Sequence, residues 1–400
     1  MAISEINDKS LAASAVTATK LATSAVTATK LATSAVDLTS NKVTGILPAA
    51  NVPTEFKNIN PNIFINGNFD VWQRSTSYTE NQGAAWFYGS ADRWAHHNDG
   101  ADAGVFARDT VVPNANSRYS MKLTGAANIV GTNLNTRLEY MDTAPLRKAN
   151  AFTVSGWARA STAGQTISMM MLLSNVKDSF AWPYHSFGLG TSATISGNGT
   201  IAASGSMTLT TANTWYYFTV TNNNPNSVTA TNGNFSNGFS LQLSIPTLNA
   251  SSKTVNLSQF KLEPGLVATE FVPKTFAEEV RDCQRYCCKF GASDASNPVS
   301  SLGVGTQYNT NATNIMMTLP QPMRTQPSAT TSSGNWMATY IGYGGTNISV
   351  VPSVDDGNNG EYPTSRVRLY MPNNGTGSSQ GMSSWNQTLT NKHITFSSEL

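Results

Sequence analysis

The sequence has few charged side chains. Asp, Glu, Lys and Arg together make up only 12% of its 400 residues, about half the share usual in globular proteins. The formal net charge is +2, and the basic residues are scattered, with no run of Lys or Arg. A chain without a basic patch has no electrostatic means of capturing nucleic acid or an anionic membrane surface. We therefore expect neither nucleic acid nor a membrane among its partners.

Long apolar runs are also missing. The longest, from Met169 to Leu173, is far too short to cross a bilayer. The first ten residues, MAISEINDKS, contain neither the basic nor the apolar part of a signal peptide. These observations predict a protein that is not secreted and does not insert into a membrane.

Motifs that carry catalysis are absent as well. The sequence contains no nucleophile elbow, phosphate-binding loop, zinc motif or dinucleotide fingerprint. Asp355, Asp356 and Glu361 come nearest to a glycosidase pair, but their loop is rich in Gly and Asn. Such a loop offers no evident burial that would raise the pKa of a carboxyl group for acid catalysis. We therefore predict a protein that is not an enzyme and that needs no cofactor.

Cysteine and histidine, the usual metal ligands, are scarce. Cys283, Cys287 and Cys288 lie within six residues of one another, and no His or further Cys is near enough to complete a zinc site. We expect reduced thiols in a packed helix. His96 and His97 are adjacent, and adjacent strand residues point to opposite faces of a sheet. We therefore expect this pair to lie in a solvent-exposed loop and not at a metal site.

The residues that are present favour β-structure. Apolar residues make up 40% of the chain, and the polar remainder is rich in Asn, Thr, Ser and Gly, which favour strands and turns. Residues 152–160 and 215–220 read as strands, and a slip in the apolar pattern near Ser258 and Gln259 predicts a β-bulge. Strict alternation is clearest where the apolar positions are Phe239, Leu241, Leu243 and Ile245. Many short strands separated by turns predict a jelly-roll β-sandwich over residues 56–274.

Residues 17–36 repeat almost the same ten letters, TATKLATSAVTATKLATSAV. Large apolar residues recur every five positions from Leu11 to Val36, a spacing that forms no single helical stripe. Neither an alanine-faced helix nor an extended chain would bury enough surface alone. We interpret residues 1–55 as an N-terminal attachment region and a thin oligomeric stalk, helical or extended. A disordered Ala/Thr/Ser linker is the alternative.

A helix is predicted over residues 275–290. Thr275 and Glu278 form a capping box, with acidic residues in the first turn. The apolar positions follow the heptad spacing of a helix-packing seam: Phe276, Val280, Cys283, Cys287 and Phe290. A helix this short is marginal in isolation. We expect it either to pack on the sandwich or to pair with copies of itself around an axis.

Several stretches resemble a signature of phage and prophage tail-associated proteins. They are "NGNFDVWQR" (66–74) followed by "ADRW" (91–94), and "VNLSQFKLEPGLVATEFVPKTFAEEVRDCQRY" (255–286). "LPQPMRTQPSATT" (319–331) resembles the strand that commonly follows them, and "TGILPAANVP" (44–53) is similar to the turn between stalk and head in tail fibres. The matches frame most of the chain from residue 43 to residue 331. One departure is Ser75, where this family usually has Gly.

The resemblance implies a homotrimer with a jelly roll like that of carbohydrate-binding modules and a C-terminal β-rich head at residues 291–400. Related jelly rolls often place an acidic ligand for a structural calcium after the first strand, where this chain has Asp70. Calcium needs about six oxygen ligands, and only this one is identified. From the residues themselves, Trp72 and Trp94 are expected in the core. Whether Arg74 and Asp92 form an ion pair stays open.

Aromatic residues among polar loops are the candidate binding residues, because sugars stack on aromatic faces and hydrogen-bond to amides, carboxylates and hydroxyls. The C-terminal region offers six candidates, namely Trp336, Tyr340, Tyr343, Asp355, Asp356 and Trp385. An earlier stretch, "DSFAWPYHSFGLG" (178–190), adds Trp182, Tyr184 and His185. The alternative for that stretch is a loop packed on the sandwich or on a neighbouring subunit.

Together these features predict a mainly β protein: a jelly-roll sandwich, a short heptad helix and a C-terminal β head, preceded by the stalk. We predict a tail-fibre protein of a phage virion, made in the host cytoplasm. It would be a homotrimeric receptor-binding adhesin for a host surface polysaccharide, held by its N-terminus to other tail or adaptor proteins. Two alternatives are a capsid decoration fibre without an essential receptor role and a capsule depolymerase tailspike.

Overall fold

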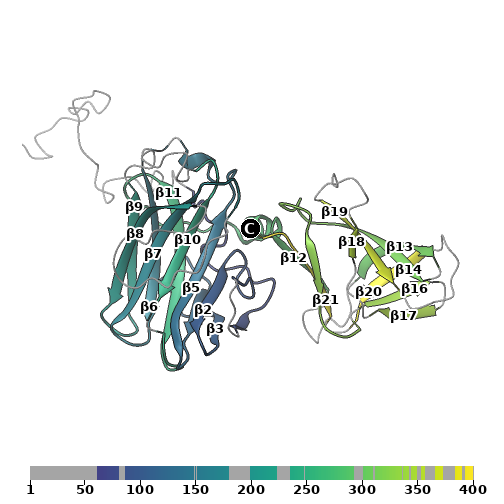
Figure 1. The fold of residues 1–400 in the computed structure, drawn as a ribbon, viewed down its shortest axis with the longest axis horizontal. Helices are drawn as coiled ribbons and strands as arrows, with labels where there is room; N and C mark the ends of the chain where they lie inside the picture. Colours follow the sequence, from purple (N-terminus) through teal and green to yellow (C-terminus); the bar gives the residue numbers. More distant parts are fainter. Residues whose placement is uncertain are drawn as a thin grey trace, which may run out of the picture. The chain divides into compact units, whose positions relative to one another are not determined.

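The computed structural model (Figure 1) describes residues 61–80, 86–147, 149, 151–179, 199–222, 235–246, 248–291, 301–309, 311–335, 337–341, 344–348, 353–355, 365–372, 383–389 and 392–399. The expected attachment region and stalk, residues 1–55, lie outside these ranges. The described part is mainly β, as predicted, and its strands form antiparallel sheets. None of the helices in these ranges is long and apolar enough to span a membrane.

Two sheets form the predicted sandwich. The first sheet has the strand order β1 (Ser77–Glu80), β3 (Gly104–Asp109), β4 (Ser120–Thr124), β11 (Thr254–Pro264), β6 (Phe152–Ala160) and β9 (Trp215–Asn222). The second sheet has the order β2 (Ala95–Gly100), β5 (Ile129–Leu138), β10 (Phe239–Ile245), β7 (Gln165–Ser174) and β8 (Gly199–Leu209). Figure 1 shows the strands of the second sheet side by side. A short 3₁₀ helix, η6 (Ala144–Leu146), follows β5.

One hydrophobic core lies between the two sheets. The predicted alternation in β10 is confirmed, because Phe239, Leu241, Leu243 and Ile245 are all fully buried in this core. Trp94 is buried there too, and Trp72 packs against it while partly buried, as expected. Burying one large apolar side chain contributes about 1.5–3 kcal/mol. Because side chains alternate along a strand, the residues that face the core also determine which residues point away from it.

The predicted bulge in β11 is confirmed. The pairing of β11 with β6 shifts its register between Ser258 and Lys261. Gln259 has φ = 54°, a left-handed conformation that non-glycine residues seldom adopt. The extra residue returns Phe260 and Leu262 to the core side, where both are fully buried. The bulge thus explains why the alternation of apolar residues shifts by one position at this point of the sequence.

The helix α1 (Phe276–Gln284) begins at its predicted cap. The Thr275 side chain accepts the backbone N–H of Glu278, and the Glu278 carboxylate accepts the backbone N–H of Thr275, which completes the capping box. Val280 and Cys283 pack against Ile65 and Val71, which flank the start of the signature stretch. The helix therefore packs on its own chain, one of the two outcomes expected from the sequence.

The predicted end of this helix is wrong. The helix stops at Gln284, and residues predicted to continue it form the strand β12 (Cys287–Gly291). This strand pairs with β21 (His393–Ser397), which supplies backbone hydrogen bonds from about a hundred residues further along the chain. Cys287 and Phe290 are thus strand residues, and the expected five-residue trimer seam does not exist as one helical stripe. Phe276, its first member, is 59% exposed.

The three cysteines are free thiols, as expected, but only Cys283 lies in the helix. Cys287 and Cys288 belong to β12. All three are buried. Burial raises the pKa of Cys288 to about 12 and that of Cys283 well above its ordinary value. The thiols are therefore protonated at neutral pH and serve as small packing groups.

The C-terminal strands form two further sheets, confirming a β-rich region that begins at Cys287, slightly before the predicted residue 291. A three-stranded sheet has the order β12, β21 and β15 (Ser328–Thr331). A seven-stranded sheet has the order β17 (Gly344–Ile348), β16 (Met337–Ile341), β20 (Ser383–Thr388), β13 (Ser301–Asn309), β14 (Ala312–Thr318), β19 (Arg366–Pro372) and β18 (Ser353–Asp355). Residues of both sheets share a second hydrophobic core, which includes Cys288, Phe396, Ile315 and Leu369.

Candidate functional site

The second sheet turns a row of polar side chains away from the sandwich core. Its core-facing residues, such as Leu134 in β5 and Leu241 in β10, alternate with polar residues whose side chains must point to the opposite side. We call this side the polar face. It consists of His97 from β2, Asn133, Asn135 and Arg137 from β5, and Ser240, Gln242 and Ser244 from β10, all of them buried.

One line of residues crosses the polar face from strand to strand. His97 lies opposite Asn133, and Asn133 lies opposite Ser244. Asn133 and Ser244 are 0% and 1% exposed, yet Asn133 Oδ1 and Ser244 Oγ have no hydrogen-bond partner among the described residues. Leaving a buried polar atom unsatisfied costs about 1–3 kcal/mol. This pair of oxygens can accept hydrogen bonds from a bound molecule only if that molecule enters this buried face.

Trp86 lies at the β2 end of this line. The centroid of its ring is 5.8 Å from that of His97. Its indole Nε1 is buried and has no acceptor within the described part of the chain. An indole N–H is a donor only, so Trp86 adds an unsatisfied donor and an aromatic surface at the end of this line, with His97 between it and Asn133.

The next line of the polar face is held in place by its own hydrogen bonds. Asn135 Nδ2 donates to Ser240 Oγ over 2.6 Å, and Arg137 Nε donates to Asn135 Oδ1 over 3.0 Å. Gln242 lies directly opposite Asn135. This line therefore fixes the side chains next to Asn133 and brings one positive charge to a face on which Asn133 also bonds to the Asp99 carboxylate.

The expectation that His96 and His97 form a solvent loop is wrong, because both belong to β2 and are buried. Their side chains do point to opposite sides. His96 stacks on Phe106 with ring centroids 4.2 Å apart and contacts Glu80 at 3.2 Å, while His97 lies on the polar face. Burial lowers the pKa of His96, so its ring is neutral at pH 7. The sequence does not show that Phe106 and Glu80 surround His96, and these contacts hold its ring inside the sandwich.

The polar face was missed by sequence reasoning, although a signal for it exists. In "TNLNTRL" (132–138) and "FSLQLSI" (239–245), the positions between apolar residues hold amides, hydroxyls and one Arg. Such positions are normally solvent-exposed on an antiparallel sheet. Only the structure shows that they are buried and that the two segments are adjacent strands in register.

The structure places three of the predicted binding residues on strands. Tyr340 in β16 lies directly opposite Trp385 in β20, so the fold brings these two positions together. Asp355 ends β18 at the far edge of the same sheet, separated from β16 by β20, β13, β14 and β19. The other predicted positions lie outside the described residues, namely Trp336, Tyr343, Asp356, Trp182, Tyr184 and His185. Their roles stay predictions.

Asp70, the expected calcium ligand, is partly buried. Its Oδ2 accepts a hydrogen bond from Asn68 Nδ2 over 2.9 Å, while its Oδ1 is buried without a partner among the described residues. Burial raises the pKa of this carboxyl. The described residues contain no group of three or more His, Cys, Asp or Glu side chains that could hold a metal. A calcium at Asp70 stays a prediction.

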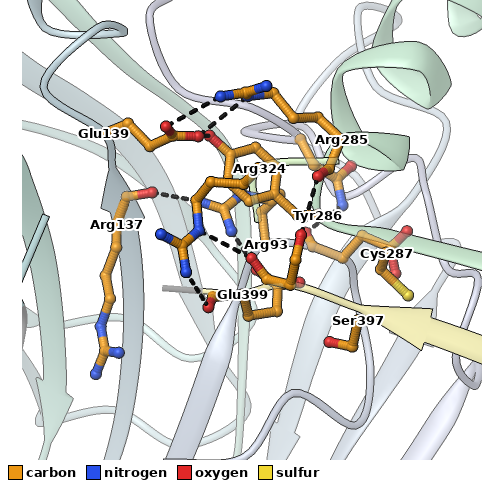
Figure 2. Close-up of polar contacts among 12 residues, drawn as sticks. Arg93, Arg137, Glu139, Arg285, Tyr286, Cys287, Arg324, Ser397 and Glu399 are labelled. Atoms are coloured by element: carbon orange, nitrogen blue, oxygen red, sulfur yellow. Dashed lines mark hydrogen bonds and ion pairs between the residues drawn. The ribbon is translucent and has the colours of Figure 1, made fainter. Parts of the chain in front are cut away.

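The signature stretches meet the C-terminal residues in a buried cluster of charges, drawn in Figure 2. We call it the junction network. It consists of Arg74, Asp92, Arg93, Glu139, Arg285, Tyr286 and Glu399. Arg74 and Asp92, whose pairing the sequence left open, do form an ion pair in this network, with Arg74 Nη1 3.6 Å from Asp92 Oδ1.

Glu399 is the anionic centre of the junction network. Its Oε1 accepts from Arg74 Nη2 over 3.0 Å, and its Oε2 accepts from Arg93 Nη1. Arg324 holds the backbone of this segment, donating to the carbonyls of Ser398 and Glu399 over 2.9 and 3.0 Å. Nearby anions, above all Glu399, raise the pKa values of both Arg74 and Arg93 despite their burial. Both guanidinium groups are therefore charged, and the Glu399 carboxylate compensates their buried positive charge.

Tyr286 connects this centre to Glu139 and Asp142, in the segment that follows β5. The Arg93 guanidinium lies over the Tyr286 ring, 3.5 Å from its centroid, and the Tyr286 hydroxyl donates to Glu139 Oε1 over 2.6 Å. Arg285 binds both oxygens of the Glu139 carboxylate, each at 3.1 Å (Figure 2). Arg93, from the ADRW stretch, is 0% exposed. Its contacts are thus structural, and the network is no candidate ligand site.

Asp92 should make stability depend on pH. Burial, the largest cause, raises the pKa of its carboxyl from 3.8 to about 6, against the opposing effects of Arg74 and Gln73. A group with a raised pKa in the folded state stabilises the fold below its unfolded pKa and loses that contribution as the pH rises. We expect the denaturation midpoint of the wild type, relative to Asp92→Asn, to fall between pH 4 and pH 7. A relative midpoint that rises over this range would show that Arg74 outweighs burial.

Comparison with known proteins gives structural likeness only. No family model matches the sequence, and no curated protein is similar to it. Among solved structures, TmCBM61 in complex with β-1,4-galactotriose aligns with 51% of this chain and 99% of its own, at 12% identity and a TM-score of 0.28. The CBM22-1 xylan-binding domain of Paenibacillus barcinonensis Xyn10C aligns with 52% and 97%, at 8% identity and a TM-score of 0.28.

A phage protein is also among the similar structures. The enzymatically active domain of bacteriophage CBA120 tailspike protein 4 aligns with 51% of this chain but only 21% of its own, at 12% identity and a TM-score of 0.31. The structural neighbours thus include carbohydrate-binding modules and a tailspike domain. At such identities and TM-scores they decide nothing about the ligand or activity of this chain.

Proposed function

We propose that this protein binds a glycan through the polar face of the second sheet. The observation that carries the proposal is the pair of buried oxygens without a partner among the described residues, Asn133 Oδ1 and Ser244 Oγ, directly opposite each other on neighbouring strands. Trp86, whose Nε1 also lacks a partner there, lies at the β2 end of the same line, beyond His97. Sugar hydroxyl groups donate and accept hydrogen bonds at once, so an oligosaccharide lying along this line can satisfy both kinds of atom. The aromatic ring of Trp86 suits the apolar face of a sugar residue at the β2 end of the line.

The composition of the polar face favours a sugar over other ligands. It carries amides and hydroxyls, with Arg137 as its one guanidinium, and it lacks the run of positive charge that a polyanion would need. Its side chains are also fixed before binding, because Asn135, Ser240 and Arg137 hydrogen-bond to one another. A preorganised site avoids part of the entropy cost of ordering side chains on binding.

A biological setting for this activity is suggested by the sequence resemblance. In our proposal the chain is a homotrimeric tail-fibre adhesin of a phage, attached through its N-terminal residues, that binds a host surface polysaccharide without cleaving it. The repeat at residues 11–36 and the signature stretches around Arg74 and Arg93 support this proposal. Three copies would raise weak individual affinities through avidity. A capsid decoration fibre is the second setting, and antibody labelling of intact particles separates the two.

The glycan-binding proposal is tested with the full-length purified protein on a panel of bacterial surface polysaccharides. We expect retention on at least one polysaccharide, competition by its oligosaccharides, and no release of reducing ends. Release of reducing ends would contradict the non-enzymatic part. Absence of binding to every polysaccharide of a host that carries the phage would contradict the proposal itself. Light scattering tests the trimer, which a mass of one chain at micromolar concentration would exclude.

A further inference from the structure

A pair of aromatic side chains lies on the outer side of the first sheet. Trp157 in β6 and Tyr217 in β9 are directly opposite in register, and their ring centroids are 5.1 Å apart. Their neighbours in sequence point to the core, where Ala158 and Phe218 are buried and Tyr216 packs. Because side chains alternate along a strand, Trp157 and Tyr217 point away from the core. We call them the aromatic pair.

The aromatic pair is accessible. Tyr217 is 43% exposed and Trp157 is half-buried. The pair lies at the margin of the sheet, since β9 is the last strand in the order and β6 is next to it. Further inward, buried polar residues of β11 such as Ser258 hydrogen-bond to the segment around Ser117. The two aromatic rings therefore lie on a part of this outer face that a ligand can reach.

Polar groups with fixed positions surround the aromatic pair. Arg159, two residues from Trp157, is held by Asn213 through Nε at 3.1 Å and Nη2 at 2.7 Å. These two bonds do not use the donors of its Nη1 group. The Tyr217 hydroxyl hydrogen-bonds to Ser155. Thr219, exposed on the next outward position of β9, adds a hydroxyl.

From this combination we infer a second carbohydrate contact, on the sheet opposite the polar face, that takes a neutral hexopyranose residue. A pyranose has a flat face of C–H groups and a rim of hydroxyl groups. One ring of the aromatic pair, whose two planes are inclined by 48°, matches the C–H face, and Arg159 and Thr219 match the rim. A purely apolar ligand would leave these donors and acceptors unused, and a simple polyol would not use the rings. The inference goes beyond the proposed function, which concerns the polar face alone.

The structural alternative is a cross-strand aromatic pair that only stabilises the edge of the sheet, by about 0.2–1 kcal/mol. The two roles differ in what they predict for a ligand. A stabilising pair changes the melting temperature when it is removed but leaves sugar binding unaltered. A binding pair controls the affinity for a pyranose, and a retained aromatic ring at position 157 should rescue it.

The test uses the full chain and four defined probes: methyl β-D-glucopyranoside, methyl β-D-galactopyranoside, methyl α-D-mannopyranoside and sorbitol. Saturation-transfer difference NMR should show contact with the ring C–H protons of at least one pyranoside and none with sorbitol. We expect Trp157→Ala and Tyr217→Ala to weaken that binding by at least about tenfold, the equivalent of 1.4 kcal/mol. Trp157→Phe should retain most of it.

Two control variants separate this site from other effects. Tyr119→Ala removes a half-buried aromatic ring that contacts Arg108 and Arg118, and it should leave pyranoside binding unchanged. Asn133→Ala disables the polar face and should likewise leave binding at the aromatic pair intact. Unchanged affinity in folded Trp157→Ala and Tyr217→Ala would overturn the inference. So would a wild type that binds none of the pyranosides.

Discussion

Replacing Glu399 with Gln should lower the free energy of unfolding by about 3–5 kcal/mol, because it removes one partner of a buried ion cluster. The carboxylate of Glu399 is shared by Arg74 and Arg93, whose side chains are 11% and 0% exposed. Without it, both guanidinium groups stay buried with less compensating negative charge. Thermal or denaturant unfolding followed by circular dichroism measures this loss, and we expect the largest effect of any single charge removal in the described part of the chain.

The matched control for Glu399→Gln is Asp282→Asn. Asp282 also forms an ion pair, with Lys274 Nζ at 2.8 Å, but the side chains of this pair are 38% and 29% exposed. Exposed pairs contribute about 0–1 kcal/mol, so this variant should unfold almost like the wild type. Equal destabilisation by the two substitutions would contradict the central role assigned to Glu399.

Replacing Asn133 with Ala should weaken glycan binding by roughly 10- to 100-fold, which corresponds to about 1.4–2.7 kcal/mol. The substitution removes the buried Oδ1 that has no partner among the described residues, together with the amide that donates to Asp99. Ser244→Ala, which removes the opposite hydroxyl, should have a smaller effect in the same direction. The measurement is isothermal titration with the oligosaccharide that competes best in the polysaccharide panel.

Thr132→Val is the matched control for the polar face. Thr132 is the neighbour of Asn133 on β5, but its side chain faces the other side of the sheet, and its buried Oγ1 has no partner within the described ranges. Replacing this hydroxyl with a methyl group of similar shape removes an unsatisfied polar atom and should be neutral or stabilising. Binding should not change. If Asn133→Ala binds as the wild type does, the polar face is not the glycan site.

Local pattern predicted much of the sandwich. Alternation located β10, the slip near Ser258 located the bulge, and the Thr275–Glu278 capping box located the start of α1. Each of these features depends on residues that are close in sequence. The end of α1 failed for the opposite reason. The spacing of Cys287 and Phe290 fits a heptad, but pairing with β21, far away in sequence, gives this segment better backbone hydrogen bonds as a strand.

The polar face depends on contacts that the sequence does not display. Its residues come from β2, β5 and β10, and nothing in the sequence shows that His97, Asn133 and Ser244 lie in one line. Polar residues between apolar ones predict a solvent-exposed side of a sheet, so their burial also came from the structure alone. Most of the binding residues predicted from aromatic content lie outside the described residues. Among those that are described, Tyr340 and Trp385 occupy directly opposite positions on neighbouring strands.

The pairing of Arg93 with Glu399 also constrains how the protein can fold during its synthesis. The two residues are 306 positions apart, and at about 5–20 residues per second the ribosome needs roughly 15–60 s to make the intervening chain. Throughout that interval a nascent sandwich contains two arginines whose carboxylate does not yet exist. The sandwich must therefore either leave this corner open to solvent or wait for the later strands. Completion of the junction is thus a late step of folding, which requires the chain to have been made as far as Glu399.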